Sequence, residues 1–292
     1  KILMKFGLRY LNTGPNVDPA KAIAMAQAAE EVGFESVWTV DHVVIPQDYK
    51  SAYPYSQSRR LGDGTENIDL PDPLIYMAYL AAATTKIRLA TGILIVPQRS
   101  PVVTAKQLGT LDYMSGGRID LGIGVGWLEE EFQAIGVPFE KRGKRTDECI
   151  SAMRALWKDD IAEFHGDLIN FGPVFCRPQP INKTIPIIVG GHSKAAAIRA
   201  GRIGDGFFPA RGCPEDLFSL VKSTARDCGR DPDEVEFTVS VPDDLSAIPE
   251  MAKLGVKRIL IPSSAMGGTS KWASNPDEVF ALKDLIQKYA EI

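Results

Sequence analysis

The feature that most constrains the fold of this chain is the repeated alternation of short apolar runs with longer helical patterns. Short apolar runs bounded by turn residues are typical of buried strands, and a helix after each strand is typical of parallel sheets. We expect strands at residues 4–10, 35–40, 87–96, 118–122, 185–189, 205–208, 235–241 and 258–261. Eight strand–helix units of this kind predict a closed (β/α)8 TIM barrel.

Helix boundary signals support this organisation. Asp18 and Pro19 stand where a helix cap and a first helical residue are preferred, and Gly33 stands where a helix ends. Further helices are expected near residues 74–84, 101–114, 144–157, 193–203, 214–228, 245–254 and 276–290. An open doubly wound sheet is the alternative, but it requires a glycine-rich turn after the first strand with an acidic residue about 20 positions later. Residues 9–14 lack that spacing.

One segment interrupts the alternation. Residues 159–183 are rich in Phe, Gly and Pro and have no helical period, which predicts a hairpin-like insertion between strands four and five. The length of 292 residues suits one barrel of about 250 residues with such an insertion. We therefore expect residues 1–292 to form a single domain.

The composition favours a protein that handles small molecules. A net charge of −4 and a pI near 5.6 provide no positive field for nucleic acid or for an acidic membrane surface. The four cysteines lie far apart with no C-x-x-C pair, so we expect no metal site, no disulfide framework and a cytoplasmic location. No apolar run reaches about 18 residues, and the amino terminus runs directly into a strand, so we expect no membrane span and no signal peptide.

Chemistry in a TIM barrel takes place at the carboxyl ends of the strands. The second expected strand ends at Asp41 and His42, and a long polar loop extends from residue 41 to residue 71. Histidine is the side chain best suited to move a proton near neutral pH, so His42 is the candidate catalytic residue, with a structural role as the alternative. His165 falls in the insertion, where we expect an ordinary turn residue.

Glycines mark other strand ends. The fourth strand runs into Leu121–Trp127, whose alternate glycines either bring bare backbone to a flat or anionic ligand or only allow tight packing on neighbouring strands. These glycines are Gly122, Gly124 and Gly126. At the end of the third strand, Gly92 before the β-branched Ile93 predicts a bulge or an unusual peptide bond, with a plain strand glycine as the alternative.

The fifth strand ends in Gly190 and Gly191 and leads through Ser193 into a helix. Free N–H groups and the positive end of the helix dipole meet there, which suits a phosphate group. The alternative is that Ser193 is an ordinary helix cap, because phosphate sites in barrels more often follow strands seven and eight. Both interpretations stay open at this point.

Five motifs in chain order together resemble the bacterial luciferase-like family, and the similarity runs over nearly the whole chain. They are Ser36–His42, Arg88–Leu94 leading to Pro101, Leu111–Arg118, Leu121–Gly126, and Ile188–Gly191 continuing to Gly204–Gly206. Members of this family are (β/α)8 barrels that use reduced flavin or the deazaflavin coenzyme F420. The Asp–His pair after the second strand and the compact insertion resemble the F420-dependent branch more than luciferase itself.

The resemblance implies a role for each matching residue. Asp41 would contact the cofactor, and His42 would lie beside the redox-active carbon of the deazaflavin as proton donor, proton acceptor or charge stabiliser. The Gly92–Ile93 peptide would be the family's cis bond, which supports the face of the tricyclic ring. The remaining contacts would come from residues that line the ring or tail, Val125 and Gly126, and from residues that hold the phosphate, Gly190, Gly191, Ser193 and Lys194.

One residue departs from the pattern of the sugar-phosphate dehydrogenases in this branch. They carry a glutamate directly after the last glycine of the fourth-strand motif, where this chain has Trp127. The chain is thus unlike a sugar-phosphate dehydrogenase, and Trp127 suggests an apolar or aromatic wall for the substrate. Glu129, Glu130 and Glu131 follow, but glutamates that open a helix are usually solvated, so the role of base is not transferred to them.

We therefore expect an oxidoreductase that moves a hydride between F420 and a small organic substrate. An FMN-dependent monooxygenase that uses reduced flavin and oxygen is the main alternative, because the same barrel and phosphate loop serve both cofactors. The presence of both Asp41 and His42 disfavours a non-catalytic flavin-binding barrel, and the lack of a strong lysine candidate at a strand end disfavours an aldolase or isomerase. Dimers are usual in the family, so a homodimer is expected.

Overall fold

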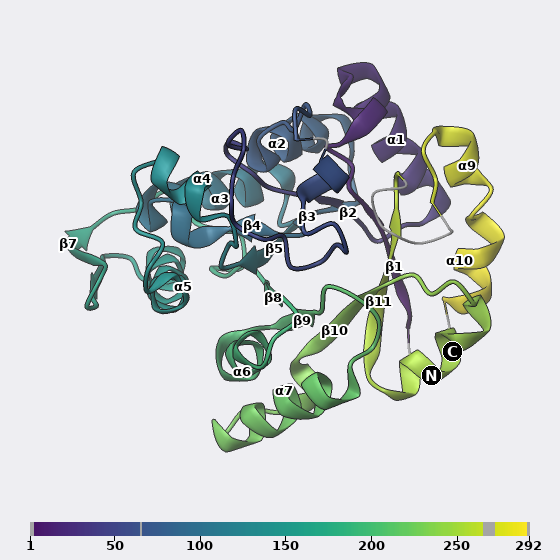
Figure 1. The fold of residues 1–292 in the computed structure, drawn as a ribbon. Coiled ribbons are helices and arrows are strands. Elements are labelled where there is room, and N and C mark those ends of the chain that lie inside the picture. Colours follow the sequence, from purple (N-terminus) through teal and green to yellow (C-terminus); the bar gives the residue numbers. More distant parts are fainter. Residues whose placement is uncertain (1–2, 65, 265–271, 291–292) are drawn as a thin grey trace.

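The computed structural model describes residues 3–64, 66–264 and 272–290, and a parallel barrel surrounded by helices forms its centre (Figure 1). The strand order around the barrel is β1-β2-β3-β5-β8-β9-β10-β11, and β11 pairs again with β1, which closes the barrel. The barrel strands are β1 Lys5–Arg9, β2 Ser36–Thr39, β3 Arg88–Thr91 with β4 Leu94–Ile95, β5 Ile119–Gly124, β8 Ile187–Gly190, β9 Gly206–Phe208, β10 Glu236–Ser240 and β11 Val256–Pro262. The expected (β/α)8 TIM barrel is confirmed.

The helices follow the boundary signals of the sequence. Helix α1 begins after Asp18, whose carboxylate accepts a hydrogen bond from the N–H of Lys21, and ends at Gly33 in the left-handed conformation. The helices are α1 Pro19–Val32, α2 Pro73–Ala83, α3 Pro101–Ser115, α4 Glu129–Ala134, α5 Arg142–Lys158, α6 Lys194–Ile203, α7 Glu215–Asp227, α8 Ile248–Lys253, α9 Pro276–Phe280 and α10 Lys283–Tyr289. The glutamate run opens a helix, α4, as expected, and one detail differs from expectation: the last helix is divided into α9 and α10.

The third barrel position is shared by two short strands. The residues of β3 and β4 both pair with β5, and the chain between them contains a cis peptide bond between Gly92 and Ile93. The expectation of an unusual peptide bond at this place is confirmed. The continuous strand expected over residues 87–96 is therefore interrupted at the barrel mouth.

The insertion between strands four and five is an antiparallel hairpin of β6 Ala162–His165 and β7 Asn170–Val174. It projects from the barrel at the end of α5 (Figure 1), and His165 lies in it with an exposed side chain 3.5 Å from Glu163. None of the described helices is long and apolar enough to cross a membrane.

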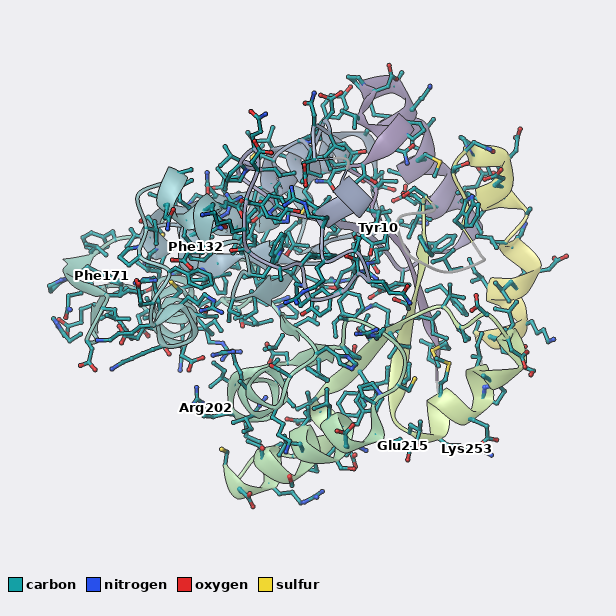
Figure 2. The ribbon with its side chains drawn as sticks, in the orientation of Figure 1. Tyr10, Phe132, Phe171, Arg202, Glu215 and Lys253 are labelled. Atoms are coloured by element: carbon teal, nitrogen blue, oxygen red, sulfur yellow. The ribbon has the colours of Figure 1, made fainter. Side chains whose placement is uncertain are left out.

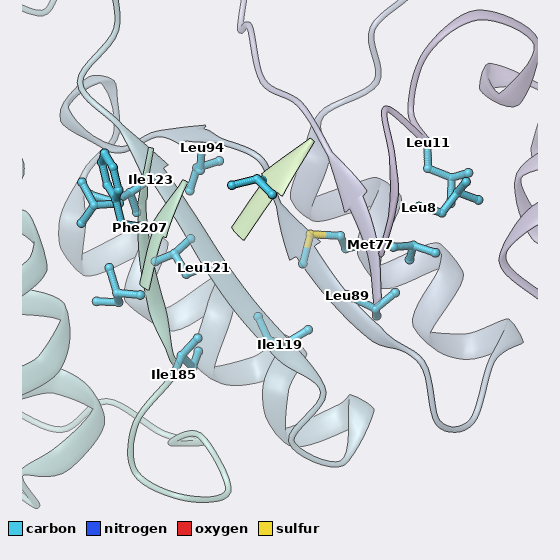
Figure 3. Close-up of a cluster of buried hydrophobic side chains, with 14 of the residues drawn as sticks. Leu8, Leu11, Met77, Leu89, Leu94, Ile119, Leu121, Ile123, Ile185 and Phe207 are labelled. Atoms are coloured by element: carbon cyan, nitrogen blue, oxygen red, sulfur yellow. The ribbon is translucent and has the colours of Figure 1, made fainter. Parts of the chain in front are cut away.

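Alternation along the strands separates the outer core from the barrel interior. Ile119, Leu121 and Ile123 of β5 belong to the buried cluster between the sheet and the helices (Figure 3). The residues between them face the barrel axis, because successive strand residues point to opposite faces. Inside, the middle of the barrel is filled by the apolar side chains of Trp38, Ala90, Ile188, Phe208 and Leu260. The carboxyl ends of the strands lie above this plug, which places the candidate site at that mouth.

Candidate active site

His42 follows β2 at the mouth and is held by a carboxylate from α4. Its Nδ1 atom lies 2.9 Å from Oε2 of Glu131, whose side chain is 0% exposed. Burial by itself raises the pKa of the Glu131 carboxyl, but hydrogen bonding and the charge of His42, with the N–H of Val43, bring it below the usual value. An ionised carboxylate only accepts, so Nδ1 carries the hydrogen and donates it. Among the described residues, none forms a hydrogen bond with the other ring nitrogen, Nε2.

Two of the three glutamates of α4, Glu130 and Glu131, also bind the loop that follows β2. Oε1 of Glu131 accepts hydrogen bonds from the N–H of Val43 at 2.7 Å, and Oε1 of Glu130 accepts one from the N–H of Lys50 at 2.7 Å and one from that of Ser51 at 3.1 Å. Burial acts to raise the pKa of Glu130, but hydrogen bonding with the Ser51 side chain and with the backbone of Lys50 and Ser51 lowers it to about 2. The expectation that the glutamate run is simply solvated is therefore wrong for Glu130 and Glu131.

A sequence signal for the burial of Glu131 exists and was missed. Leu128, Glu131, Phe132 and Ile135 stand at the i, i+3, i+4 and i+7 positions that share one helix face. Leu128 and Phe132 are fully buried, so Glu131 lies on the inner face of α4 between them. Because Glu131 is charged, the sequence pattern of this helix face does not read as a continuous apolar stripe.

Asp41 is buried between the ends of β2 and β3. Its Oδ2 accepts a hydrogen bond from the N–H of Ile95 at 2.9 Å, and its Oδ1 accepts one from Nη2 of Arg99 at 2.8 Å. Both oxygens are thus used inside the protein, and they tie the chain that carries His42 to the chain that carries Ile93. Its contact with a cofactor stays a prediction.

The strand-end glycines are explained by close packing within the protein. An added Cβ at Gly124 would lie 2.5 Å from Ile93, as would one at Gly190, and an added Cβ at Gly122 would collide with the carbonyl of Thr91. At Gly126, whose φ is +81°, it would lie 2.7 Å from Phe132. Of the two interpretations of Leu121–Trp127, tight packing is therefore the one that the geometry supports. As a consequence of this packing, the partly exposed side chain of Ile93 lies over Gly124 and Gly190, at the ends of two strands.

Aromatic side chains gather above His42. The Trp127 ring makes edge contacts with three rings, with centroid distances of 6.0 Å to His42, 5.5 Å to Tyr49 and 5.1 Å to Tyr53. Burial raises the pKa of the Tyr55 hydroxyl in the same loop, and the backbone of His192, beyond β8, opposes that rise, so these two residues lie close together. The loop after β2 therefore reaches across the mouth, and Trp127 lies among its aromatic rings. Its role as a wall for the substrate stays a prediction.

The loop after β8 combines a helix cap with unused donors. The Ser193 hydroxyl accepts a hydrogen bond from the N–H of Ala196 at 3.2 Å, so Ser193 is a helix cap. Gly191 has a φ of +136°, and its N–H donates to the carbonyl of Phe208 at 3.1 Å. In the described part of the chain, Nδ1 of His192 is buried without a partner. The first N–H groups of α6, which begins at Lys194, have no carbonyl partner within the helix.

The fold and the site together define a TIM barrel with a carboxylate-held histidine at its mouth. The family model described as luciferase-like monooxygenase matches residues 3–258 of this chain. The chain belongs to this luciferase-like family.

Relatives in the family use different cofactors. An uncharacterised protein of Mycobacterium tuberculosis is 38% identical over 206 residues, which are 70% of each chain. The FMNH2-dependent dimethylsulfone monooxygenase of Pseudomonas putida is 35% identical over 189 residues, 63% of this chain and 47% of that one. The F420-dependent glucose-6-phosphate dehydrogenase of Kineococcus radiotolerans is 28% identical over 288 residues, 95% of this chain and 79% of that one.

Solved structures show the same fold. An F420-dependent secondary alcohol dehydrogenase has a TM-score of 0.75 with 19% identity and covers 98% of this chain and 99% of its own. The coenzyme F420-dependent tetrahydromethanopterin reductase of Methanopyrus kandleri has a TM-score of 0.76 with 18% identity and covers 99% of both chains. At such low identity, the likeness shows the fold alone.

Proposed function

We propose that this protein is an oxidoreductase that transfers a hydride between coenzyme F420 and a small organic substrate. The observation that carries the proposal is the state of His42. Its Nδ1 hydrogen is held by the buried Glu131, which leaves Nε2 as the atom that can take up or release a proton at the mouth. A histidine fixed in one tautomer by a carboxylate suits general acid–base chemistry.

The surroundings of His42 suit a flat tricyclic ring. His42 and Ile93 follow adjacent strands, which pair through Thr39 and Thr91. Ile93 is partly exposed and lies over the backbone of Gly124 and Gly190, so it offers an apolar surface at the mouth. In this proposal the ring rests on Ile93 with its edge at His42, and the partly exposed Val125 and Gly126 line the ring or tail.

The loop after β8 suits a phosphate of the cofactor. Free helix N–H groups and the dipole of α6 meet there, next to His192, whose buried Nδ1 has no partner among the described residues, and Lys194 is the first residue of the helix. In this proposal, Gly190 and Gly191 allow the phosphate to approach the backbone, while Ser193 and Lys194 contact it. F420 and FMN both carry a phosphate, so this loop serves either cofactor.

Each residue has a distinct part in the proposed reaction. The deazaflavin, when bound, supplies or accepts the hydride. His42 donates or takes the accompanying proton at Nε2, and Glu131 keeps the hydrogen of the ring on Nδ1. Trp127, Tyr49 and Tyr53 exclude water from the mouth and provide the wall for an apolar or aromatic substrate.

A monooxygenase that uses reduced FMN and oxygen is the second candidate. The observation in its favour is the 35% identity to the dimethylsulfone monooxygenase, which is higher than the 28% identity to the F420-dependent dehydrogenase but spans a shorter stretch. The same mouth and phosphate loop would hold FMN.

Binding of the two cofactors tests the proposal. Purified apoprotein is titrated with F420 and with FMN, each followed by its own absorbance and fluorescence. We expect F420 to bind at least about tenfold more tightly than FMN. His42→Gln should keep the affinity within about tenfold, because proton transfer is lost rather than contact area, and His165→Gln is the matched histidine control outside the site. Tighter binding of FMN would favour the second candidate, and binding of neither would refute both.

A further inference from the structure

One arginine in the barrel interior, Arg9, forms no ion pair with a carboxylate of the described residues. Along β1, Gly7 faces the barrel axis, because an added Cβ there would lie 2.6 Å from Leu260 and 2.8 Å from Trp38. Lys5 and Arg9 stand two positions to either side and face the axis as well. Arg9 is at the carboxyl end of the strand, so it lies in the upper layer of the interior, at the mouth that holds the candidate site.

The other inward-facing cations of the barrel are all paired. They lie in the lower layer and form ion pairs, Lys5 with Glu236 at 2.8 Å, Arg88 with Asp120 at 2.6 Å, and Arg258 with Glu35 at 2.8 Å. By contrast, no carboxylate of the described ranges forms an ion pair with Arg9. Residues 265–271, which follow β11 in sequence, include no Asp or Glu. The missing partner is therefore a property of this position and not of the barrel.

Neighbouring side chains hold the guanidinium of Arg9 in place, but its Nε–H donor has no acceptor among the described residues. Its Nη1 donates a hydrogen bond to the hydroxyl of Ser240 at 3.0 Å, and its carbon lies 4.2 Å from the ring centre of Tyr10 and 4.8 Å from that of Phe208. Tyr10, labelled in Figure 2, has a left-handed φ of 65° directly after β1. Nε of Arg9 is buried, and no described residue accepts its hydrogen. A buried charged donor without an acceptor is costly, which indicates that a ligand supplies the acceptor.

A tyrosine of the loop after β2 lies within electrostatic reach of Arg9. The Tyr53 ring lies 5.1 Å from that of Trp127. Burial raises the pKa of the Tyr53 hydroxyl to about 12, and the charge of Tyr10 adds to the rise while the charge of Arg9 opposes it. Tyr53 is therefore a neutral donor that lies within electrostatic reach of Arg9 and next to the Trp127 ring.

We propose that Arg9 binds a carboxylate of the substrate, and that the substrate is an organic anion whose apolar or aromatic body lies against Trp127 and Tyr53. The planar guanidinium presents parallel N–H groups that match the two oxygens of a carboxylate. Tyr53 supplies a further donor at the same end. The assignment of this anion as substrate rests on the proposed function, whereas the binding site itself does not.

Calorimetric titration with two probes of equal shape tests the site. Benzoate has the carboxylate, and benzamide is its neutral counterpart. We expect the wild type to bind benzoate, and Arg9→Met to bind it at least about tenfold more weakly because a charge-assisted bidentate contact is lost. Benzamide should bind more weakly than benzoate to the wild type and equally to both proteins. Arg226→Met, which removes an exposed charge in the last turn of α7, is the matched control and should bind benzoate as the wild type does.

The same proteins separate this site from the cofactor site. F420 and FMN affinities of Arg9→Met should stay within about threefold of the wild type. Arg9→Lys keeps the charge without the planar fork and should bind benzoate with intermediate affinity, which guards against a variant that fails to fold. Equal benzoate binding by wild type and Arg9→Met, no benzoate binding by the wild type with or without cofactor, or a parallel loss of cofactor affinity in Arg9→Met would each overturn the proposal. Failure of both cofactors to bind would refute the proposed function and leave the benzoate result decisive for Arg9.

Discussion

Replacing Glu131 with Gln should reverse which nitrogen of His42 carries the hydrogen. The carboxylate accepts a hydrogen bond from Nδ1 of His42 at 2.9 Å through one oxygen and another from the N–H of Val43 at 2.7 Å through the other. An amide has one acceptor oxygen and one NH2 group, so it cannot accept both. If its oxygen keeps the N–H of Val43, the NH2 group faces Nδ1, which must then accept. The ring hydrogen moves to Nε2.

The expected loss of stability follows from the two hydrogen bonds, from His42 and from Val43, that lose an ionised acceptor. Glu131 is fully buried, so solvent cannot replace them. We expect the free energy of unfolding to fall by about 1–3 kcal/mol. In a reaction direction that requires Nε2 to accept a proton, turnover should fall by about 10²- to 10⁴-fold, the range that proton transfer contributes.

Nitrogen NMR of the histidine rings measures the change without a substrate. The chain has three histidines, so ¹⁵N-histidine labelling gives three pairs of ring nitrogen signals, and His42→Gln assigns one pair. At a pH where the ring is neutral, we expect the hydrogen on Nδ1 in the wild type and on Nε2 in Glu131→Gln. Glu129→Gln makes the same charge change in the same turn of α4 and should leave His42 unchanged. An unchanged tautomer in Glu131→Gln, with unfolding altered by less than about 0.5 kcal/mol, would refute this reasoning.

Gly191→Val should weaken F420 binding by at least about tenfold without unfolding the barrel, because φ is +136° and a Cβ would lie 3.0 Å from Ala196; unchanged affinity in a calorimetric titration would place the phosphate elsewhere. The pKa of Glu130 falls from 4.5 to about 2 on folding. The stabilisation of the loop by the ionised Glu130 carboxylate is therefore fully present above pH 4.5 and is lost as the pH falls towards 2. Amide exchange of residues 48–53, corrected for its intrinsic pH dependence, should increase from pH 6 to pH 3 more in the wild type than in Glu130→Gln, and equal increases would contradict this. Ile75 and Val103 are 74% and 55% exposed on neighbouring helices α2 and α3, so we expect them in the homodimer interface. Light scattering should give a dimer for the wild type and a monomer for the double variant Ile75→Glu/Val103→Glu. A monomeric wild type would argue against the interface.

The sequence was sufficient for the fold because its signals are local. Each barrel strand is a short apolar run, and caps such as Asp18 and Gly33 mark helix ends from neighbouring residues alone. The position of His42 at a strand end also follows from local pattern. The cis bond between Gly92 and Ile93 was expected from family resemblance as well as from the glycine before a β-branched residue, and it is confirmed.

The missed features depend on residues far apart in the chain. Whether Gly124 makes room for a ligand or for a side chain depends on Ile93, which a different strand supplies. The partner that satisfies the Glu131 carboxylate is His42, 89 residues earlier. The local helix pattern indicates that the Glu131 side chain is buried, but it cannot name that partner. The pairing of Asp41 with Arg99 was missed for the same reason.

A crystal structure of the protein with F420 bound tests the central proposal most directly. The proposal predicts that the deazaflavin ring rests on Ile93, with its redox-active carbon within about 3.5 Å of Nε2 of His42. It also predicts that the phosphate lies at the start of α6, beside Gly191 and Lys194. A ring bound outside the barrel mouth, or one whose redox-active carbon lies far from His42, would contradict the account.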